Sequence, residues 1–268
     1  PAGFVRYGKY LMLPLVFLAL VRERARYAVL YVCGYRILGL AAVIAGKLLG
    51  KPVVLKADSE GELSGAFVWM DARIARHRAL SWVAGWLLAV RNALLRRADL
   101  FISISDGIAQ ELRRHGVPPQ AIRSIPNGID TSRFHPVTAQ EKRELRRHLG
   151  LPDNGVVVAY SGKLNRRKGL ERLLLVWTSV AARYPETLLL LIGSGEGQCS
   201  SCEPALRAFV RKQGLAERVR FTGFVEDVHR YLQASDVYVF PSEGEGFPLA
   251  PLEALACALP VISTRVGG

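Results

Sequence analysis

The sequence predicts an α/β protein of two domains, each built on a parallel β-sheet with helices on both faces. Short apolar runs alternate with segments of helical periodicity along the whole chain. The apolar runs are continuous rather than alternating, which is typical of parallel strands that are buried on both faces. With 268 residues, half of them apolar, the chain is long enough to form two hydrophobic cores.

The predicted elements follow one another with this alternation. Strands are expected where four to six apolar or β-branched residues stand together, at 28–32, 52–55, 100–104, 156–161, 187–192, 219–222, 236–240 and 260–263. Helices are expected between them, near 36–49, 80–97, 106–115, 138–149, 169–183, 203–213, 226–234 and 251–258. In such sheets ligands bind beyond the carboxyl ends of the strands, so functional motifs are expected directly after strands.

The domain boundary is predicted at PNGIDTSRFHP, residues 126–136, which holds two prolines and an Asn-Gly turn signal. We expect a first domain at 1–125, a linker and entry segment at 126–155, and a second domain at 156–268. The chain opens at Pro1 rather than Met and stops at Gly267-Gly268, directly after a strand. It is therefore expected to be a fragment, with each domain incomplete at its outer end. The apolar run 11–21 is too short to span a bilayer, and no signal peptide is predicted.

The positive charge is concentrated in the first half of the chain. Residues 1–125 carry 18 basic and 8 acidic side chains, whereas residues 126–268 carry 18 and 15, within a total of +13. This asymmetry favours an anionic partner for the first domain, although a solvated surface is also compatible with it. Cys199 and Cys202 form one isolated CxxC, and the histidines do not cluster. No zinc site or His-based catalytic pattern is therefore predicted.

Two glycine-bearing loops follow strands of the second domain. After 156–161 comes GKLNRRKG, in which Lys163, Arg167 and Lys168 stand close to a predicted helix start. Cations there oppose the positive end of the helix dipole, and together with backbone N–H groups they form a site for phosphate. The spacing is not that of a Walker loop. After 187–192 comes GSGEG, where Gly193 and Gly195 indicate either a tight turn or a close backbone approach to a nucleotide.

A third segment, SEGEGFPLAPLEALA, holds two carboxylates at a fixed separation. Glu245 lies in the loop after 236–240, and Glu253 is expected in the first turn of the next helix, where Pro251 is also tolerated. Carboxylates accept several hydroxyl hydrogen bonds and suit the binding of a polyol. For Glu253, a favourable interaction with the helix dipole is the structural alternative.

These motifs occur in the order PNGIDTSRFHP, SGKLNRRKG, IGSGEG, VRFTGFVEDVHRYLQASDVYVFPS and EGFPLAPLEALACALPVISTRVGG. In this order the chain resembles the family 4 glycosyltransferases, densely from about residue 98 to 268 and loosely before that. The resemblance implies the GT-B fold, with two Rossmann-like domains whose parallel sheets face each other across a cleft. It implies a retaining hexosyltransferase that moves sugar from a nucleoside-diphosphate donor to an acceptor hydroxyl, in the synthesis of cell-surface glycans or glycolipids.

The resemblance also implies roles for single residues. Lys163 and Lys168 bind the donor diphosphate and neutralise the leaving group, so that neither a metal ion nor another cofactor is expected. Glu245 completes the catalytic set by accepting hydroxyls of the donor sugar. The nucleotide base is expected near Val225 and the ribose at Glu253. The other donor-binding residues implied are Gly162, Arg167, Gly193, Gly195, Gly246, Phe247, Pro248 and Leu249.

The first domain departs from the family pattern, because many relatives have a histidine after the strand PVVLK. Here the segment reads KADSEGELSG, in which Asp58 or Glu60 is the candidate for an orienting role on the acceptor side. The acceptor is expected to be a glycan, a lipid-linked sugar or a small molecule. The helix SWVAGWLLAVRNALLRR places Trp and Leu ahead of Arg, which suits either core packing or a peripheral contact with an anionic membrane. The expected location is cytoplasmic, at the inner membrane surface.

Three other functions compete with glycosyl transfer. A glycoside hydrolase accounts for Glu245 and Glu253 but not for the basic loop. A basic binding protein accounts for the net charge but not for the paired carboxylates, and no nucleic-acid-binding motif is present, so nucleic acid is not expected as a partner. A sugar-nucleotide epimerase of related fold would use the donor without an acceptor.

Overall fold

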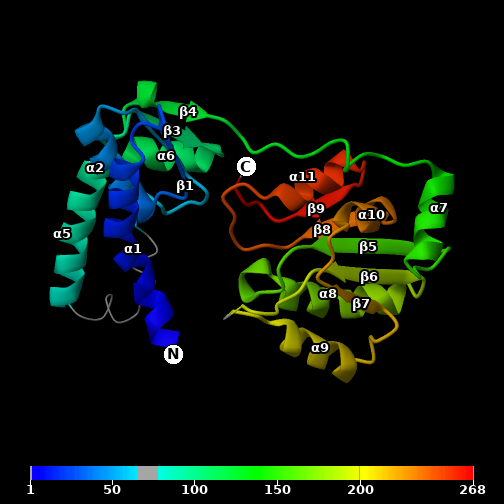
Figure 1. Cartoon of the computed structure of the whole chain (residues 1–268). Helices are drawn as coiled ribbons and strands as arrows, with labels where there is room; N and C mark the ends of the chain where they lie inside the picture. The colour runs from blue at the N-terminus through cyan, green and yellow to red at the C-terminus, as the bar shows by residue number, and fades with distance from the viewer. Residues whose placement is uncertain (1, 66–77, 199, 268) are drawn as a thin grey trace. The chain divides into compact units, whose positions relative to one another are not determined.

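The computed structural model describes residues 2–65, 78–198 and 200–267 (Figure 1). The chain divides into a first unit, Pro1–Asn127, and a second unit, Gly128–Val266. Each unit contains one sheet in which all neighbouring strands are parallel. The predicted α/β class is therefore confirmed. Within the described residues, no helix has the length and apolar character needed to cross a membrane.

The first unit contains a four-stranded sheet in the order β1-β2-β3-β4. Its strands are β1 (Leu30–Cys33), β2 (Val53–Lys56), β3 (Leu100–Ser103) and β4 (Ile122–Ser124). Its helices are α1 (Ala2–Arg22), α2 (Leu38–Leu49), α5 (Arg78–Leu95) and α6 (Asp106–Arg114). Helix α2 packs against both α1 and α5, and α6 packs against β3 and β4.

Two elements of the first unit were not predicted from the sequence. Helix α1 has no distinct apolar face and contains Pro14, so it shows none of the 3.6-residue periodicity on which the helix predictions relied. Strand β4 has only three residues and its side chains at Arg123 and Ser124 are exposed, so no apolar run marks it. The short strand exists because parallel pairing with β3 satisfies its backbone.

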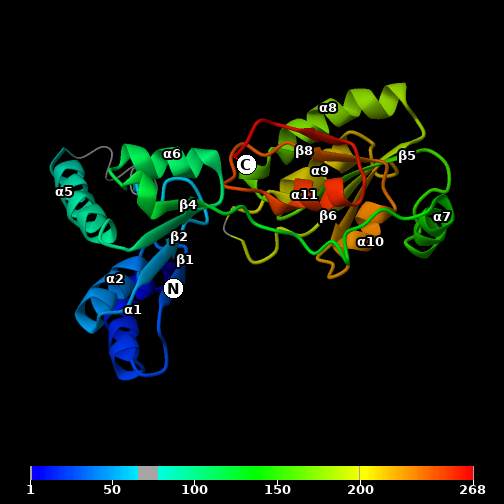
Figure 2. The same ribbon diagram turned by 90° about the horizontal axis from the view of Figure 1, so that it is seen from above.

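The second unit contains a five-stranded sheet in the order β7-β6-β5-β8-β9. Its strands are β5 (Val156–Ser161), β6 (Thr187–Ile192), β7 (Val219–Gly223), β8 (Val237–Phe240) and β9 (Val261–Ser263). Its helices are α7 (Ala139–His148), α8 (Leu170–Arg183), α9 (Glu203–Lys212), α10 (Val228–Gln233) and α11 (Leu249–Ala256). Helix α8 covers one face of the sheet with α9 beside it, and α10 and α11 cover the other (Figure 2).

The winding of the second unit indicates where a ligand site is expected. From β5 the chain moves outward to β6 and β7 and then crosses back to β8 on the other side of β5. Every residue of β6 is buried and only Val156 of β5 is exposed, as expected for central parallel strands. The change of direction between β5 and β8 is a topological switch point, and loops that diverge there leave room for a ligand at the carboxyl ends of the strands.

The segment before β5 is tied to the sheet by one carboxylate. Asp236, at the start of β8, accepts hydrogen bonds from the Val157 N–H at 2.7 Å and the Lys142 ammonium at 2.7 Å. It also pairs with the Arg146 guanidinium, whose side chain is only 7% exposed. Helix α7 begins with a capping box in which Thr138 and Glu141 satisfy each other's backbone N–H groups. The predicted entry segment 126–155 thus contains a helix that belongs to the second unit.

Candidate functional site

Two loops meet at the switch point, one after β5 and one after β8. The Glu243 N–H donates to the Arg167 carbonyl at 2.9 Å, and the Ser242 hydroxyl oxygen lies 3.3 Å from the same carbonyl oxygen. Gly169 allows this approach, because its φ is +67° and a Cβ there would lie 2.0 Å from the Pro241 carbonyl oxygen. A side chain at this position would push the two loops apart.

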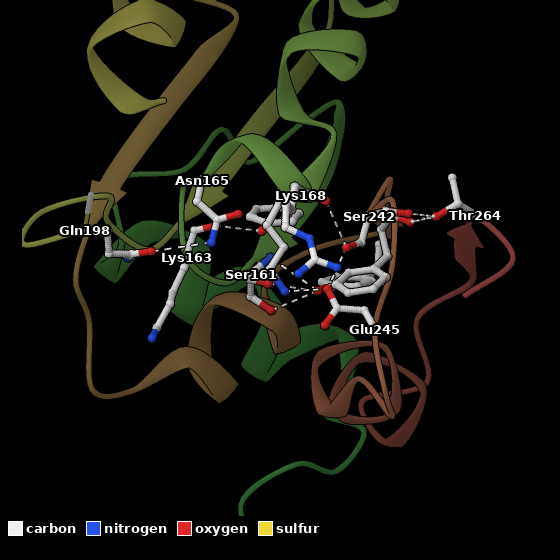
Figure 3. Close-up of polar contacts among 12 residues, drawn as sticks. Ser161, Lys163, Asn165, Lys168, Gln198, Ser242, Glu245 and Thr264 are labelled. Atoms are coloured by element: carbon white, nitrogen blue, oxygen red, sulfur yellow. Dashed lines mark hydrogen bonds and ion pairs between the residues drawn. The ribbon is translucent and has the colours of Figure 1, made fainter. Parts of the chain in front are cut away.

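The meeting of these loops brings Lys168 and Glu245 into direct contact. The Lys168 ammonium lies 2.5 Å from Glu245 Oε1, and the Ser242 hydroxyl donates to the same oxygen, also at 2.5 Å (Figure 3). The two charged side chains are 21% and 18% exposed. The ammonium also lies 5.7 Å from the centroid of the Phe240 ring. Two residues that the sequence placed in one site, 77 positions apart, are therefore brought together.

The loop after Glu245 presents backbone donors. Among the residues that the structure describes, none accepts a hydrogen bond from the N–H groups of Gly246 and Phe247. Pro248 is the N-cap of α11, and Leu249 is its first residue. Free N–H groups at a helix entrance, next to a lysine, form a site suited to an anion or to sugar oxygens.

Glu253 is a half-buried carboxylate without a counter-charge in contact. In the described part of the chain its side chain takes part in no hydrogen bond or ion pair. Desolvation by burial raises its pKa, and the more distant Arg133 opposes the shift. The prediction that it lies in the first turn of the helix was wrong: α11 starts at Leu249, so Glu253 lies in the second turn. Stabilisation by the helix dipole, which acts within the first turn, therefore does not explain this carboxylate.

A pocket of about 810 Å³ opens at the carboxyl ends of β5, β6 and β7. It gathers several of the predicted donor-site residues: Gly162, Lys163, Gly193 and Val225. Phe224, with 79% of its surface exposed, lies at the same pocket. Figure 3 shows the Lys163 side chain directed away from the Lys168–Glu245 pair. The side chains of the two lysines that the sequence assigned to one diphosphate thus point in different directions.

Two of the three glycines of GSGEG, Gly193 and Gly195, are required by the packing of the chain itself. Gly193 has a φ of +133°, and a Cβ there would lie 2.0 Å from the Gly162 carbonyl oxygen. A Cβ on Gly195 would lie 2.1 Å from the Ser201 hydroxyl oxygen. The Gly195 N–H donates to Glu203 at 2.7 Å, and Arg207 pairs with the same carboxylate. Of the two readings of this motif, the tight turn accounts for the glycines without a ligand.

Asp58 and Glu60 belong to the first unit, in the loop that follows β2. Both side chains are exposed. Two other carboxylates hold this loop: Glu62 accepts from the N–H groups of Tyr35 and Asp58, and Glu111 accepts from those of Gly61, Leu63 and Ser64. Desolvation raises the pKa of Glu62, which is 3% exposed. These hydrogen bonds hold the backbone of the loop that carries Asp58 and Glu60.

Three residues that matter for the geometry were missed by the sequence reasoning. Ser242 is buried and holds Glu245, Glu203 closes the glycine loop, and Phe224 lines the pocket. A serine three residues before Glu245 and a glutamate that opens a helix after a glycine loop are visible in the sequence. Their partners are not local, so only the fold identifies them. Cys199, half of the CxxC, lies outside the described residues, and Cys202 is buried and free.

Comparison with known proteins identifies the chain as a glycosyltransferase by class. Residues 155–268 match the family model described as Glycosyl transferases group 1, and residues 1–133 match the one described as Glycosyltransferase Family 4. Solved structures with the same arrangement of elements are GT-B glycosyltransferases. HepE from Anabaena, solved with UDP, matches with a TM-score of 0.77 at 22% identity over 95% of this chain and 64% of that chain.

The chain is also similar to several individual enzymes. The chain is 34% identical to D-inositol 3-phosphate glycosyltransferase 2 of Catenulispora acidiphila, over 68% of this chain and 43% of the relative. It is 33% identical to the lipopolysaccharide core mannosyltransferase LpsB of Rhizobium meliloti, over 65% and 47%. Sucrose-phosphate synthase of Thermosynechococcus elongatus matches with a TM-score of 0.75 at 28% identity, over 97% and 62%.

The chain belongs to the family 4 glycosyltransferases and has the GT-B type of fold. The resemblance drawn from the order of its motifs is confirmed. The chain spans about half the length of the curated relatives it matches.

Proposed function

We propose that the protein transfers a hexosyl group from a nucleoside-diphosphate sugar to an acceptor hydroxyl, with retention of the anomeric configuration. The observation that supports the proposal is the contact of Lys168 with Glu245 at the switch point, because it joins a cation suited to a diphosphate with a carboxylate suited to sugar hydroxyls. The functions of two relatives, an inositol phosphate glycosyltransferase and a lipopolysaccharide mannosyltransferase, support the same class of reaction.

Each part of a donor has a counterpart in the second unit. The diphosphate is bound by Lys168 with the free N–H groups of Gly246 and Phe247, and Lys163 approaches it from the pocket. Glu245 accepts the sugar hydroxyls. The unpaired carboxylate of Glu253 accepts the ribose hydroxyls, which offset its desolvation. The base lies against Val225 in the 810 Å³ pocket. Arg167, Gly162, Gly193, Gly195, Pro248 and Leu249 shape the loops around the donor.

The leaving nucleoside diphosphate gains negative charge as the glycosidic bond breaks. Fixed cations and N–H groups that face this charge lower the barrier without having to reorganise. Lys163 and Lys168 supply this charge in the proposal, so that the reaction proceeds without a metal ion or another cofactor. No residue of the second unit is assigned the role of general base. Asp58 and Glu60, on the rigid loop of the first unit, are proposed to orient the acceptor, which is a glycan, a lipid-linked sugar or a small molecule.

Transfer is tested by incubating the full chain with UDP-glucose, GDP-mannose or ADP-glucose and a set of glycan and lipid-linked acceptors. We expect one donor to be consumed only in the presence of acceptor, with an α-linked product by NMR and no loss of rate in EDTA. Glu245→Gln should slow transfer by about 100-fold or more, because it removes a charged group from the reacting sugar. A donor sugar epimerised without acceptor, or a β-linked product, would contradict the proposed reaction.

We further propose that the first unit contacts an anionic membrane at its cytoplasmic surface. Helix α5 exposes Trp82, Trp86 and Leu87, with 73%, 58% and 54% of their surfaces accessible. Its opposite face is also apolar, because Leu88 and Leu95 are buried in the unit. One apolar face of α5 packs within the unit, so the exposed apolar face is available to contact a second apolar environment. The exposed Arg96 and Arg97 follow directly, and residues 1–125 carry the net positive charge that anionic lipids attract.

Membrane contact predicts that the chain sediments with vesicles of anionic phospholipid and that Trp82→Ser/Trp86→Ser reduces the bound fraction about tenfold. Binding should weaken in high salt and disappear with neutral phosphatidylcholine vesicles. Leu175→Ser/Val176→Ser is the matched control, because it removes two exposed apolar side chains from α8 of the second unit. Equal loss in both double variants, or salt-independent binding, would contradict the assignment to α5.

A further inference from the structure

The two oxygens of Glu245 are treated differently by the protein. Oε1 receives both the Lys168 ammonium and the Ser242 hydroxyl, each at 2.5 Å. Among the described residues, Oε2 receives no hydrogen bond. One oxygen is therefore used to hold the carboxylate in place, and the other is presented to whatever occupies the site (Figure 3).

The two groups that hold Oε1 differ in how firmly they are fixed. Ser242 is 1% exposed, its carbonyl accepts the Thr264 hydroxyl at 2.6 Å, and Thr264 is itself bound through its N–H to the Phe240 carbonyl. Lys168 reaches Oε1 at the end of a flexible four-carbon stem. The serine is thus part of the scaffold, whereas the ammonium is able to turn to another anion without moving the backbone.

When a donor binds, two anions compete for the Lys168 ammonium. The proposed function pairs Lys168 with the diphosphate, but in this structure the ammonium already forms an ion pair with Glu245. Both anions lie in a partly buried site, where charge–charge energies exceed those in water. A nucleoside diphosphate carries more charge than one carboxylate and offers several oxygens, so it competes effectively for the ammonium.

We propose that the Lys168–Glu245 pair is an exchange contact that couples diphosphate binding to sugar recognition. This inference rests on the proposed function. The diphosphate takes Lys168, and Glu245 loses its counter-charge while Ser242 keeps it in position. The released carboxylate then accepts the hydroxyls of the donor sugar with both oxygens. Ser242 is accordingly a positioning residue, and a free sugar without a diphosphate meets a Glu245 whose Oε1 is still paired with Lys168.

The exchange predicts that removing the charge of Glu245, a residue of the proposed donor site, strengthens the binding of nucleoside diphosphate. In Glu245→Gln, Lys168 has no competing anion, so the affinity for the nucleoside diphosphate alone should rise about three- to tenfold. The extra affinity that the sugar contributes should fall in the same variant. Glu243→Gln is the matched control, because it removes the same charge from the same loop, but Glu243 pairs with Arg172 at 3.4 Å. It should leave both affinities unchanged.

The measurement is calorimetric titration of the full chain with UDP, GDP and ADP, and then with the sugar-linked form of whichever binds. Ser242→Ala should leave nucleoside diphosphate affinity within about twofold and reduce the sugar's contribution, because the released carboxylate is no longer held. Equal gains in Glu245→Gln and Glu243→Gln would show only a general charge effect and overturn the exchange. Binding without any gain in Glu245→Gln would also overturn it, leaving the donor site intact. Failure of all three nucleotides to bind the unchanged chain would instead contradict the proposed function.

Discussion

Replacing Lys168 by alanine is expected to lower the affinity for the donor's nucleoside diphosphate by about 100-fold or more. Two effects act in the same direction. The variant loses the cation that is proposed to contact the diphosphate, and it leaves Glu245 as an uncompensated carboxylate in a partly buried site. The second effect repels the incoming phosphates and makes the loss larger than that of an ordinary surface cation.

Titration of UDP, GDP and ADP against the folded variant measures this loss. Arg166→Ala is the matched control, because Arg166 is an exposed cation two residues away in the same turn and takes part in no ion pair within the described chain. We expect it to weaken binding less than about threefold. Lys163→Ala should fall between the two, because Lys163 is exposed at the pocket. Equal losses in Lys168→Ala and Arg166→Ala would mean that only the net charge of the loop matters.

Replacing Asp236 by asparagine is expected to destabilise the second unit by about 3 kcal/mol. Asp236 neutralises Arg146, a buried arginine, and Lys142, and it also accepts the Val157 N–H at the sheet. Asparagine keeps one acceptor but leaves the guanidinium without a counter-charge. The loss corresponds to a fall of about 10 °C in the melting temperature of a unit of this size. Urea unfolding followed by the fluorescence of Trp177, which is buried in this unit, measures it.

The same carboxylate gives the second unit a stability that depends on pH. Desolvation raises the pKa of Asp236, but the hydrogen bonds from Lys142 and Val157 and the charge of Arg146 outweigh it, so the pKa in the folded state is lowered. A carboxyl group with a lowered pKa binds protons more readily in the unfolded chain. Its stabilisation is therefore present above the unfolded pKa of about 3.9 and is lost as the pH falls through the folded pKa. The difference between the parent and Asp236→Asn should shrink below about pH 4.

Asp99 provides the control in the first unit, because it occupies the equivalent place. It lies before β3, accepts the Val53 N–H at 2.8 Å and pairs with Lys47 at 2.7 Å. Its cation is 46% exposed, so an unpaired Lys47 remains solvated. Asp99→Asn should cost less than about 1 kcal/mol for the pair itself and leave the unfolding of the second unit unchanged. A small effect of Asp236→Asn, similar to that of Asp99→Asn, would contradict the importance given to the buried arginine.

Much of the fold was predictable, because the strands and helices of a parallel α/β protein have recognisable short-range sequence patterns. The buried strands β5 and β6 are continuous apolar runs, and the loops that follow them carry the basic and glycine motifs. The rule that ligands bind after parallel strands pointed to the loops that hold Lys168 and Glu245, and the family resemblance selected these two residues within them. Helix α1 and strand β4 were missed because one lacks periodicity and the other lacks an apolar run, and both depend on packing with neighbours.

The sequence by itself determined the class of fold, the order of most of its elements and the loops in which the candidate site lies. These depend on residue periodicity and on turn residues, which are local properties. Only the tertiary structure decided that Lys168 and Ser242 share one oxygen of Glu245, that Glu253 stands unpaired in the second turn of α11, and that Gly193 is required by the chain itself. Contacts between residues far apart in the sequence arise from the packing of whole elements, and no local pattern records which atoms that packing brings together.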